Sequence, residues 1–384
     1  PAGVDMTRMK IEFLHDWNRT HPLSRRDRLL AWLPRYARHA ARWRGLLHLR
    51  DLVPGLPWLT ERWLGLSARR PLPRLRADPF SRDTCIDEPV GTDVNEGTKR
   101  PADTPTSPGN RPSTSAAAAH EVVLWVDTFN NWFEPDNLRA ARTVLRAAGY
   151  RVRIVRALPG QDPRRPLCCG STFLSRGLVD EARVEAQRTL AALAPWVERD
   201  VPVIGLEPAC LLTMRDEFLA LGLGTIAAKL ATNAWLLEEF LVREHQAGRL
   251  AVKWHAPGHD EVLLHGHCHQ KAFDAMPAVH TVLGWIPGLT VHEVEGSCCG
   301  MSGGFGYDAR HHDLSMQMGE LTLLPAVRQA SDRALIVTDG SACRCQIRDG
   351  AQREAVHVAR VLQQALEPQA ASLAVSTAKM NRGG

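Results

Sequence analysis

The sequence predicts an α/β protein with two similar units, each built from βαβ-type segments around a parallel sheet. From residue 121 onward, short apolar segments alternate with amphipathic segments of helical spacing, an order typical of parallel strands joined by helices. The same order occurs twice, and in both copies a Cys-Cys-Gly sequence follows a predicted strand. A helical segment and a disordered linker are expected to precede the two units.

Composition places the chain among ordinary globular proteins. Its 384 residues are 44% hydrophobic and 23% charged, which is sufficient for two or three domains with cores of their own. The net charge of +5 is uneven, because residues 1–76 contain 16 Lys and Arg but only 6 Asp and Glu. The arginines are scattered and no nucleic-acid motif accompanies them, which favours docking on an acidic neighbouring domain over binding of nucleic acid.

The sequence offers neither a membrane span nor a secretory signal. No apolar run approaches the ~20 residues that cross a bilayer, and no signal peptide is recognisable. Nine cysteines, four of them in two adjacent pairs, fit a reducing compartment and metal binding better than a disulfide framework. We therefore expect the chain in the cytoplasm, either free or peripheral to the inner membrane.

Residues 1–76 are predicted to be helical and basic. Apolar residues recur at near-helical spacing across 9–17, and arginines then alternate with Leu and Trp, which predicts amphipathic helices that pack their apolar stripe on another domain. Residues 77–119 are rich in Pro, Ser, Thr, Gly and Ala without periodicity, and are predicted to be a disordered linker. Cys85, within that linker, is expected to be a free and exposed thiol.

An internal repeat organises the rest of the chain. Glu121–Phe133 aligns without gaps with Glu261–Phe273, and a TVL tripeptide recurs at 143–145 and 281–283. Both copies continue with an apolar segment, CCG, a helix, and a third apolar strand followed by cysteine. We assign unit one to 120–224, a helical connection to 225–260, unit two to 261–370 and a disordered tail to 371–384.

The cysteines of each unit are expected to meet at one edge of its sheet. Each follows a predicted strand end, and the carboxyl ends of parallel strands share the edge at which open α/β sheets bind ligands. The candidate metal ligands are therefore four thiols in unit two and three in unit one: Cys268, Cys298, Cys299 and Cys343; Cys168, Cys169 and Cys210.

Four cysteines suit either a structural zinc ion or an iron–sulfur cluster. The usual zinc spacing of two CxxC pairs is absent, and vicinal cysteines favour the wider span of a multi-iron cluster. Glycines around the pair let backbone N–H groups approach sulfur. The neighbouring histidines are expected to be polar loop residues, with His267 and His269 donating hydrogen bonds to sulfur: His265, His267, His269, His311 and His312.

Unit one has a weaker set of candidate ligands. Thr128 stands where unit two has Cys268, so either a non-cysteine ligand such as Asp127 completes the set or the unit has lost its cluster. Cys345, two residues after Cys343, is expected to point away from it on a helix and not to be a ligand.

No acid–base constellation, GxGxxG, P-loop or nucleophile elbow stands out. No catalytic residue is therefore predicted, and electron transfer is a more natural role than a complete catalytic cycle. A zinc-stabilised, non-redox scaffold for partner assembly remains the alternative.

The doubled Cys…CCG…Cys pattern resembles the cysteine-rich CCG domain, found in heterodisulfide reductase and in the iron–sulfur subunits of glycolate oxidase and anaerobic glycerol-3-phosphate dehydrogenase. GHCHQKAF, SCCGMSGGFGYD and ACRCQIRDGAQREAVHVARVL are similar to the C-terminal third of fused FAD-linked oxidases of the D-lactate and D-2-hydroxyglutarate dehydrogenase type. The resemblance covers residues 121 to about 366 and the GVDM segment near Pro1.

The resemblance implies an iron–sulfur electron-transfer module, with a [4Fe–4S] cluster on this chain and FAD on another part of a parent protein. The implied partners are the flavin and ferredoxin-type domains of that parent and an electron acceptor, a quinone or a carrier protein. In the family a ferredoxin-type CxxCxxCxxxCP run precedes the GVDM-like segment. We therefore expect the chain to be a fragment that begins after this run and to be inactive alone.

Three departures from the family pattern limit what the resemblance implies. Glu207 and Gly340 stand where many CCG repeats have the first cysteine of a CxxC, and Thr128 replaces the leading cysteine of unit one. The five-cysteine, noncubane cluster of the reductase relatives is therefore not expected. Cys345 is an additional thiol with no assigned role.

Overall fold

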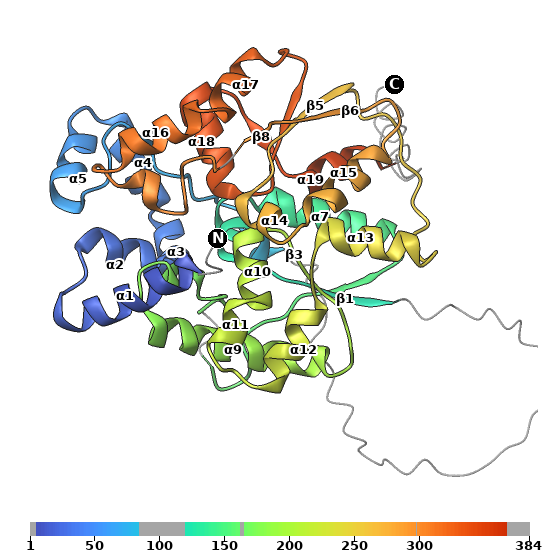
Figure 1. Cartoon of the computed structure of the whole chain (residues 1–384), viewed down its shortest axis with the longest axis horizontal. Helices are drawn as coiled ribbons and strands as arrows, with labels where there is room; N and C mark the ends of the chain where they lie inside the picture. Colours follow the sequence, from blue (N-terminus) through green and yellow to red (C-terminus); the bar gives the residue numbers. More distant parts are fainter. Residues whose placement is uncertain (1–4, 84–119, 162–164, 297, 367–384) are drawn as a thin grey trace, which may run out of the picture.

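The fold, known from a computed structural model, is described for residues 5–83, 120–161, 165–296 and 298–366. Two α/β units lie side by side, and a group of helices from the N-terminal region occupies one end of the molecule (Figure 1). Most of the predicted linker, including Cys85, and all of the predicted tail lie outside the described residues. The prediction of disorder is wrong for the first residues of this linker, 77–83, because Phe80, in the 3₁₀ turn Phe80–Arg82, is fully buried in the hydrophobic core.

The first sheet has four parallel strands in the order β2-β1-β3-β4. The apolar strands β1 and β3 lie in the middle and are buried. The strands are β1 (Glu121–Leu124), β2 (Arg151–Arg153), β3 (Val203–Gly205) and β4 (Ala234–Leu236). β4 lies within 225–260, so the predicted helical connection also supplies an edge strand.

The second sheet repeats this arrangement, with four parallel strands in the order β6-β5-β7-β8. Its strands are β5 (Glu261–Leu264), β6 (Thr290–Glu293), β7 (Leu335–Val337) and β8 (Ala355–Val356). The prediction of an α/β fold with two repeated parallel units is therefore confirmed. Because all pairs are parallel, the loops after β1, β2 and β3, and likewise those after β5, β6 and β7, leave their sheet at one edge.

Helices cover both sheets, and several begin at the loops that carry cysteine. Those of the first half are α6 (Thr128–Trp132), α7 (Pro135–Ala147), α8 (Ser171–Leu174), α9 (Val179–Val197), α10 (Pro208–Arg215), α11 (Glu217–Ala220), α12 (Thr225–Asn233) and α13 (Leu237–Gln246). Those of the second half are α14 (Cys268–Ala272), α15 (Met276–Gly284), α16 (His312–Glu320), α17 (Leu323–Gln329), α18 (Ser341–Ala351) and α19 (Val358–Gln364), with a 3₁₀ turn at Phe305–Tyr307.

The two units share one hydrophobic core. Helix α7 of unit one packs on α19 of unit two, and α15 of unit two packs on α13. In the internal repeat α7 corresponds to α15 and α13 to α19, so the two contacts are equivalent. Fully buried residues from all four helices meet there: Leu138, Val144, Phe240, Leu241, Val282, Leu283, Val361 and Leu362.

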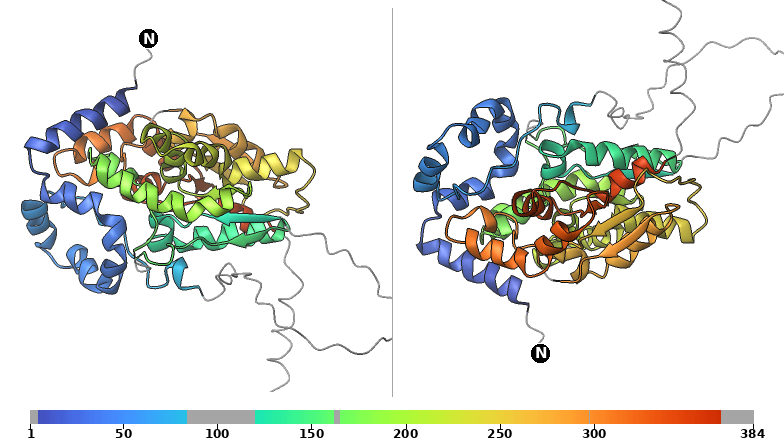
Figure 2. Two further views of the ribbon diagram at one scale, coloured as in Figure 1. Left: turned by 90° about the horizontal axis from the view of Figure 1, so that it is seen from below. Right: turned by 90° about the horizontal axis from the view of Figure 1, so that it is seen from above.

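The N-terminal helices rest on both units through polar contacts and through apolar residues such as Ala37 and Ala41, which cluster with Trp132 of α6. They are α1 (Met6–Thr20), α2 (Arg25–Ala31), α3 (Leu33–Arg42), α4 (Arg44–Leu52) and α5 (Leu56–Leu64), and both views of Figure 2 show them together at one end. Asn18 Nδ2 donates to the Arg176 carbonyl at 2.7 Å, and the Ser67 N–H donates to the Tyr307 carbonyl at 2.8 Å. Arg70 is 1% exposed and donates to Asp349 of α18.

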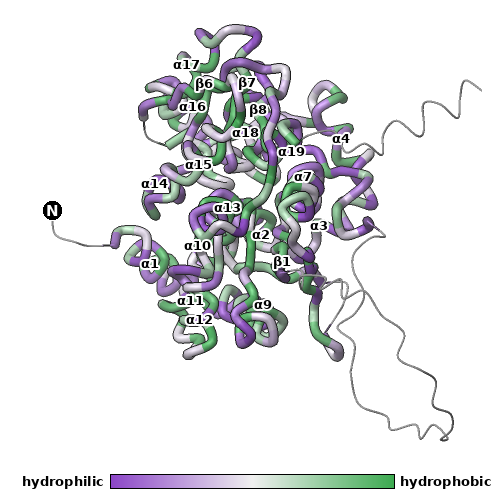
Figure 3. The backbone as a smooth tube through the Cα atoms, turned by 90° about the vertical axis from the view of Figure 1, so that its right-hand side faces the viewer, coloured by the Kyte–Doolittle hydropathy of each residue, from purple (hydrophilic) through white to green (hydrophobic). Residues whose placement is uncertain are grey.

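Much of the apolar surface of these helices is exposed. Trp43, Trp58 and Trp63 on or beside α4 and α5 are 65%, 66% and 66% exposed, and hydrophobic and hydrophilic residues alternate along the N-terminal helices (Figure 3). The predicted packing of the apolar stripe is therefore seen in part: Ala31 and Trp32 join the core of unit one and Leu66 joins that of unit two, whereas these tryptophans stay exposed. None of the described helices is both long and apolar enough to cross a membrane.

Candidate metal centre

In unit two, four cysteines come together at the carboxyl edge of the second sheet. Cys268 begins α14 after β5, Cys298 and Cys299 follow β6, and Cys343 lies in the first turn of α18 after β7. Their thiols form a continuous row, in which Cys298 interacts with both Cys268 and Cys299, and Cys299 interacts with Cys343. All four are free thiols.

Neighbouring thiols in this row shift each other's pKa in opposite directions. Hydrogen bonds from Cys268 and Cys299 lower the pKa of Cys298, and the hydrogen bond from Cys299 lowers the pKa of Cys343. The same hydrogen bonds raise the pKa of Cys268 and Cys299, and burial adds to this. The four sulfur atoms thus lie close enough to shift one another's pKa, and each can bind a cation once it is deprotonated.

The glycine of the CCG sequence fixes the shape of this loop. Gly300 has φ +90°, and a Cβ there would lie 2.2 Å from the Ser315 carbonyl oxygen of α16. Its N–H donates to Cys298 Sγ at 3.3 Å. Only glycine allows this backbone approach. Unit one repeats the contact, since Gly170 has φ +86° and donates to Cys168 Sγ at 3.4 Å.

Two groups of possible ligand atoms in unit two include histidine. The ligand atoms of His265, Cys299 and Cys343 all lie within 4.8 Å of one another, as do those of His267, Cys268 and His269. His265 is 3% exposed, and its ring interacts with the Cys343 thiol, whose pKa it helps to lower. The prediction treats His265 as a polar loop residue, but its buried place beside Cys299 and Cys343 makes it a candidate fifth ligand of this site.

His267 and His269 lie in surroundings that favour the neutral imidazole. Burial lowers the pKa of both, to about 4 for His269. His267 caps α14, where its Nδ1 accepts from the His269 N–H at 3.2 Å, and Cys268 Sγ lies 3.6 Å from His269 Nδ1. His311 and His312 lie apart from the row, with His311 Nδ1 3.0 Å from Asp308.

In unit one, the three cysteines also interact with one another, but no described residue supplies a fourth thiol there. Cys169 interacts with both Cys168 and Cys210, whose hydrogen bonds lower its pKa while their own pKa values rise. Thr128, at the place of Cys268, has a buried hydroxyl without a partner among the described residues. The proposed substitute ligand Asp127 caps α6, where Oδ1 accepts from two N–H groups and Oδ2 from the Asn130 side chain.

The two positions that depart from the CxxC pattern have structural explanations. A Cβ at Gly340 would lie 2.2 Å from His267 Cδ2, so a cysteine there requires His267 to move. Glu207 is 3% exposed and accepts from the Ser341 N–H of unit two at 3.0 Å. Burial, followed by the charge of Asp127, raises the pKa of Glu207 to about 8. Unit one therefore contributes a neutral carboxyl group next to the cysteine loop of unit two.

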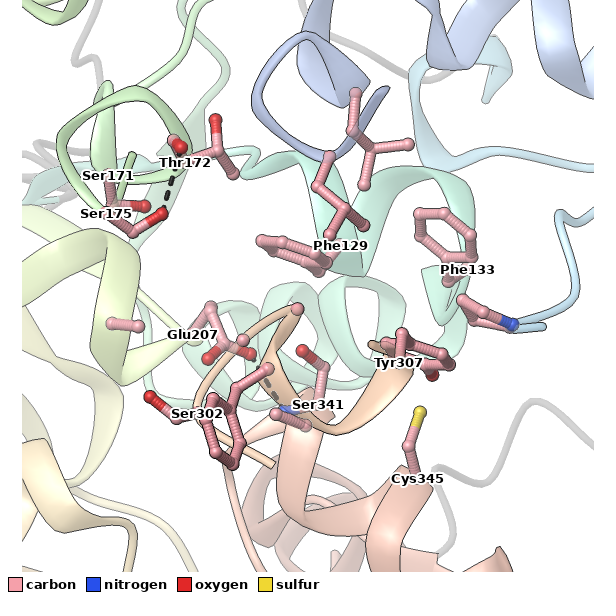
Figure 4. Close-up of a pocket in the computed structure, with 18 of the residues that line it drawn as sticks. Phe129, Phe133, Ser171, Thr172, Ser175, Glu207, Ser302, Tyr307, Ser341 and Cys345 are labelled. Atoms are coloured by element: carbon pink, nitrogen blue, oxygen red, sulfur yellow. Dashed lines mark hydrogen bonds between the residues drawn. The ribbon is translucent and has the colours of Figure 1, made fainter. Parts of the chain in front are cut away.

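A cavity of about 1900 Å³ lies between the N-terminal helices and the cysteine loops. Hydroxyl groups from both units face it, with Ser171 and Thr172 on one side, and Ser302 and Ser341 on the other (Figure 4). Aromatic and aliphatic residues line much of the remainder, among them Phe129, Phe133, Leu30, Leu33 and Tyr36. Cys268, Cys298 and Cys299 also line this cavity, whereas the three cysteines of unit one do not.

Cys345 lies in the same cavity but outside the row of four thiols. Its side chain lies near Tyr307 (Figure 4), and burial raises its pKa. Sequence reasoning named His265 only as one of several neighbouring histidines and Glu207 only as a departure from the CxxC pattern, and it did not name Tyr307. The place of His265 directly after a buried strand was the available signal, while Glu207 and Tyr307 matter only through contacts between segments distant in sequence.

Unit two matches a known cysteine-rich domain, and much of the chain is similar in sequence to known proteins. Residues 262–348 match the cysteine-rich domain CCG. One subunit of the anaerobic glycerol-3-phosphate dehydrogenase from Escherichia coli K12 is 26% identical over 250 residues, which are 64% of this chain and 59% of that protein. D-2-hydroxyglutarate dehydrogenase from Pseudomonas putida is 30% identical over 264 residues, 67% of this chain and 24% of that protein.

The chain thus carries a CCG cysteine-rich domain and is homologous to dehydrogenases and to a subunit of one. The match spans about three fifths of the length of the E. coli protein and about a quarter of the length of the P. putida enzyme. The activity of those whole proteins is therefore not carried over directly.

Proposed function

We propose that this chain, whose second unit is a CCG cysteine-rich domain, is the iron–sulfur electron-transfer module of a flavin-dependent 2-hydroxy-acid dehydrogenase of the D-lactate, D-2-hydroxyglutarate or glycolate type. The row of four thiols in unit two, two of them with lowered pKa, is the observation that carries the proposal. An iron–sulfur cluster held there supplies one-electron transfer.

In this proposal Cys268, Cys298, Cys299 and Cys343 hold a [4Fe–4S] cluster. The donor chemistry fits, because the thiols come from three loops at one sheet edge and backbone N–H groups such as that of Gly300 point at sulfur. The buried ring of His265, next to Cys299 and Cys343, is available as a further ligand or a hydrogen-bond donor to sulfur. Cys168, Cys169 and Cys210 form a second, three-thiol site that holds iron less firmly.

Electrons enter from FAD on a partner domain or partner protein and leave to a quinone or a carrier protein. Two features support this route. Cys268 is exposed, and the thiol row borders the large cavity, which has space for a small acceptor. The exposed tryptophans of the N-terminal helices and the net charge of +10 on residues 1–76 support a cytoplasmic chain that associates with the inner membrane peripherally.

Anaerobic reconstitution tests the proposal. The chain is treated with iron and sulfide under reducing conditions, and iron, acid-labile sulfide and the EPR spectrum of the reduced protein are measured. We expect Cys298→Ser to abolish the unit-two signal and to reduce iron by about one cluster, because serine does not replace a cluster-binding thiolate. Cys345→Ser is the matched control and should retain the signal.

The competing function is a zinc-stabilised scaffold without redox activity, suggested by the incomplete thiol set of unit one. One zinc per cysteine site, retained after anaerobic purification with no acid-labile sulfide, would support this scaffold and refute the electron-transfer proposal. Equal loss of the EPR signal from Cys345→Ser and Cys298→Ser would instead show that the ligand assignment is wrong.

A further inference from the structure

An exposed apolar surface lies on α4 and α5, in the group of N-terminal helices at one end of the molecule (Figure 1). Nine large hydrophobic side chains between residues 43 and 63 are 41–71% exposed, and they are half of the 18 such side chains in the described part of the chain. Helices α4 and α5 pack against each other, so these side chains belong to one surface, the α4–α5 face. An exposed apolar surface of this extent marks an interaction site. The nine side chains are Trp43, Leu46, Leu47, Leu49, Leu52, Val53, Trp58, Leu59 and Trp63.

The polar groups of these two helices are engaged within the protein. Arg50 is buried and donates to the Ser67 carbonyl oxygen at 2.6 Å. Asp51 accepts from Arg50 at 2.6 Å, and Glu61 accepts from the Ala68 N–H at 2.6 Å. Residues 43–63 contain no Ser, Asn, Gln or Tyr. Protein–protein interfaces carry about one hydrogen bond per 100–200 Å², and the α4–α5 face offers few groups to form them. Its chemistry therefore fits lipid better than a protein partner.

The unpaired charges beside this face are positive. Arg38, Arg42 and Arg62 are exposed, and none has an ion-pair partner within the described residues. Arg42 directly precedes Trp43, and Arg62 directly precedes Trp63. Tryptophan with a basic residue beside it is typical of helices that lie in the interface of an anionic bilayer. The charge thus favours a bilayer with anionic headgroups.

The two helices are suited to lie on a bilayer and are too short to cross it. Each has nine residues, whereas a spanning helix needs about 20. Trp43 and Leu47 of the α4–α5 face also line the cavity that borders the thiol row. When this face rests on a bilayer, the end of the cavity that these two residues line is therefore next to the lipid.

We propose that the α4–α5 face binds the surface of an anionic lipid bilayer, with Trp58 and Trp63 among the headgroups and with Arg42 and Arg62 next to lipid phosphates. The proposal rests on the peripheral location proposed above and deepens it by naming the face and the lipid chemistry. Docking in this way holds the cavity and the thiol row at the membrane surface, within reach of an acceptor dissolved in the lipid.

Vesicle flotation tests the docking. The full chain, prepared without iron or sulfide, is mixed with vesicles of phosphatidylethanolamine and phosphatidylglycerol, or with vesicles of phosphatidylcholine alone. We expect binding to the anionic vesicles that weakens as salt is added, because salt screens the arginines. The double variant Trp58→Ser, Trp63→Ser should bind at least about tenfold more weakly, because its interfacial anchors are removed. The double variant Arg42→Gln, Arg62→Gln should show a smaller preference for anionic lipid.

Trp17→Ser is the matched control. Trp17 is also exposed, at 47%, but it lies on α1 and outside the α4–α5 face, so this variant should bind like the parent. Lipids with brominated acyl chains provide a second measurement, since they should quench the tryptophan fluorescence of the parent and of Trp17→Ser more than that of the tryptophan double variant.

Three results overturn the proposal: no binding of the parent to anionic vesicles, equal binding of the parent and a folded tryptophan double variant, or a dimer of the parent that this variant abolishes while lipid binding is absent. The vesicle assay uses a chain without a cluster, and the EPR assay of the cluster uses no vesicles. Failure of the electron-transfer proposal therefore leaves the vesicle result unchanged, and failure of docking leaves the EPR result unchanged.

Discussion

At the scale of single residues, the cysteine loop depends on one glycine conformation. Gly300 places its N–H on Cys298 Sγ and leaves no room for a side chain against α16. The two cysteines before it are thereby directed to one side of the loop. The same geometry at Gly170 shows that the loop is a property of the CCG sequence in both units.

We predict that Gly300→Ala destabilises the apo chain by at least about 2–3 kcal/mol, because left-handed strain adds to a backbone clash. Thermal unfolding under reducing conditions measures the effect. Gly303→Ala is the control, since Gly303 also has positive φ, +59°, but no described atom lies within 4 Å of its Cβ position. It should lose only about 1 kcal/mol from the strain alone. Equal losses would show that the contact with Ser315 is unimportant.

Sequence reasoning worked best at this scale for the cysteines. Each follows a strand end, and parallel strands bring such positions together regardless of loop detail. It did not distinguish His265, which is buried beside Cys343, from the other histidines, because a histidine after a strand has the same local pattern whether it is buried or exposed. Contacts such as that of Glu207 with Ser341 depend on how the units pack, which no local pattern records.

At the scale of elements, the repeat in the sequence predicted six of the strands, since their apolar runs align between the units. The edge strands β4 and β8 were missed. β4 has three residues and β8 two, and their neighbours have helical periodicity. Pairing with β3 and β7 makes them strands, a tertiary effect that outweighs local preference.

One ion pair joins α18 of unit two to the residue that precedes α7 of unit one. Arg344 of α18 donates to Glu134, which precedes α7, through both Nε and Nη2. Burial alone would raise the pKa of Glu134, but the charge and hydrogen bonds of Arg344 hold it below its ordinary value. Arg344 is 4% exposed, so its charge has little access to water.

We predict that Glu134→Gln destabilises the chain at pH 7 by about 3 kcal/mol, because it leaves a buried guanidinium without its counter-ion. A carboxyl with lowered folded pKa stabilises the fold above its unfolded value, about 4.3, and this contribution disappears as the pH falls. The difference between the parent and the variant should therefore shrink below pH ~4, as denaturation at several pH values will show.

The exposed pair Glu320–Arg328 supplies the control. Glu320→Gln should change stability little at any pH, because exposed ion pairs contribute little. A gap between the parent and Glu134→Gln that stayed constant from neutral to strongly acidic pH would contradict the assignment to Glu134 ionisation.

At the scale of the whole molecule, buried arginines attach the N-terminal helices to unit two. Arg70 donates to Asp349 and Gln346, at 2.9 Å and 2.7 Å, across more than 270 residues of sequence. Part of the positive charge that the sequence shows in residues 1–76 is therefore buried against unit two. The sequence could not distinguish these arginines from the exposed ones, because burial follows from the docked arrangement.

We predict that Arg70→Ala lowers stability by about 1–3 kcal/mol, since it leaves the buried Gln346 Oε1 without its donor while Asp349 keeps Arg348, and that it loosens the N-terminal helices. Hydrogen exchange across residues 5–75 together with thermal unfolding measures both effects. Arg69→Ala is the neighbouring control, because Arg69 is exposed and pairs with the exposed Asp313. Faster exchange in Arg69→Ala than in Arg70→Ala would refute the assignment.

The reciprocal helix contacts have a consequence for the order in which the chain is made. Helix α7 is complete at Ala147, but its partner α19 begins at Val358, more than 200 residues later. At about 5–20 residues per second, synthesis of that interval takes about 10–40 s. Throughout it, the part of α7 that α19 covers is exposed on the ribosome, so the nascent chain carries an open apolar face until its last described helix emerges.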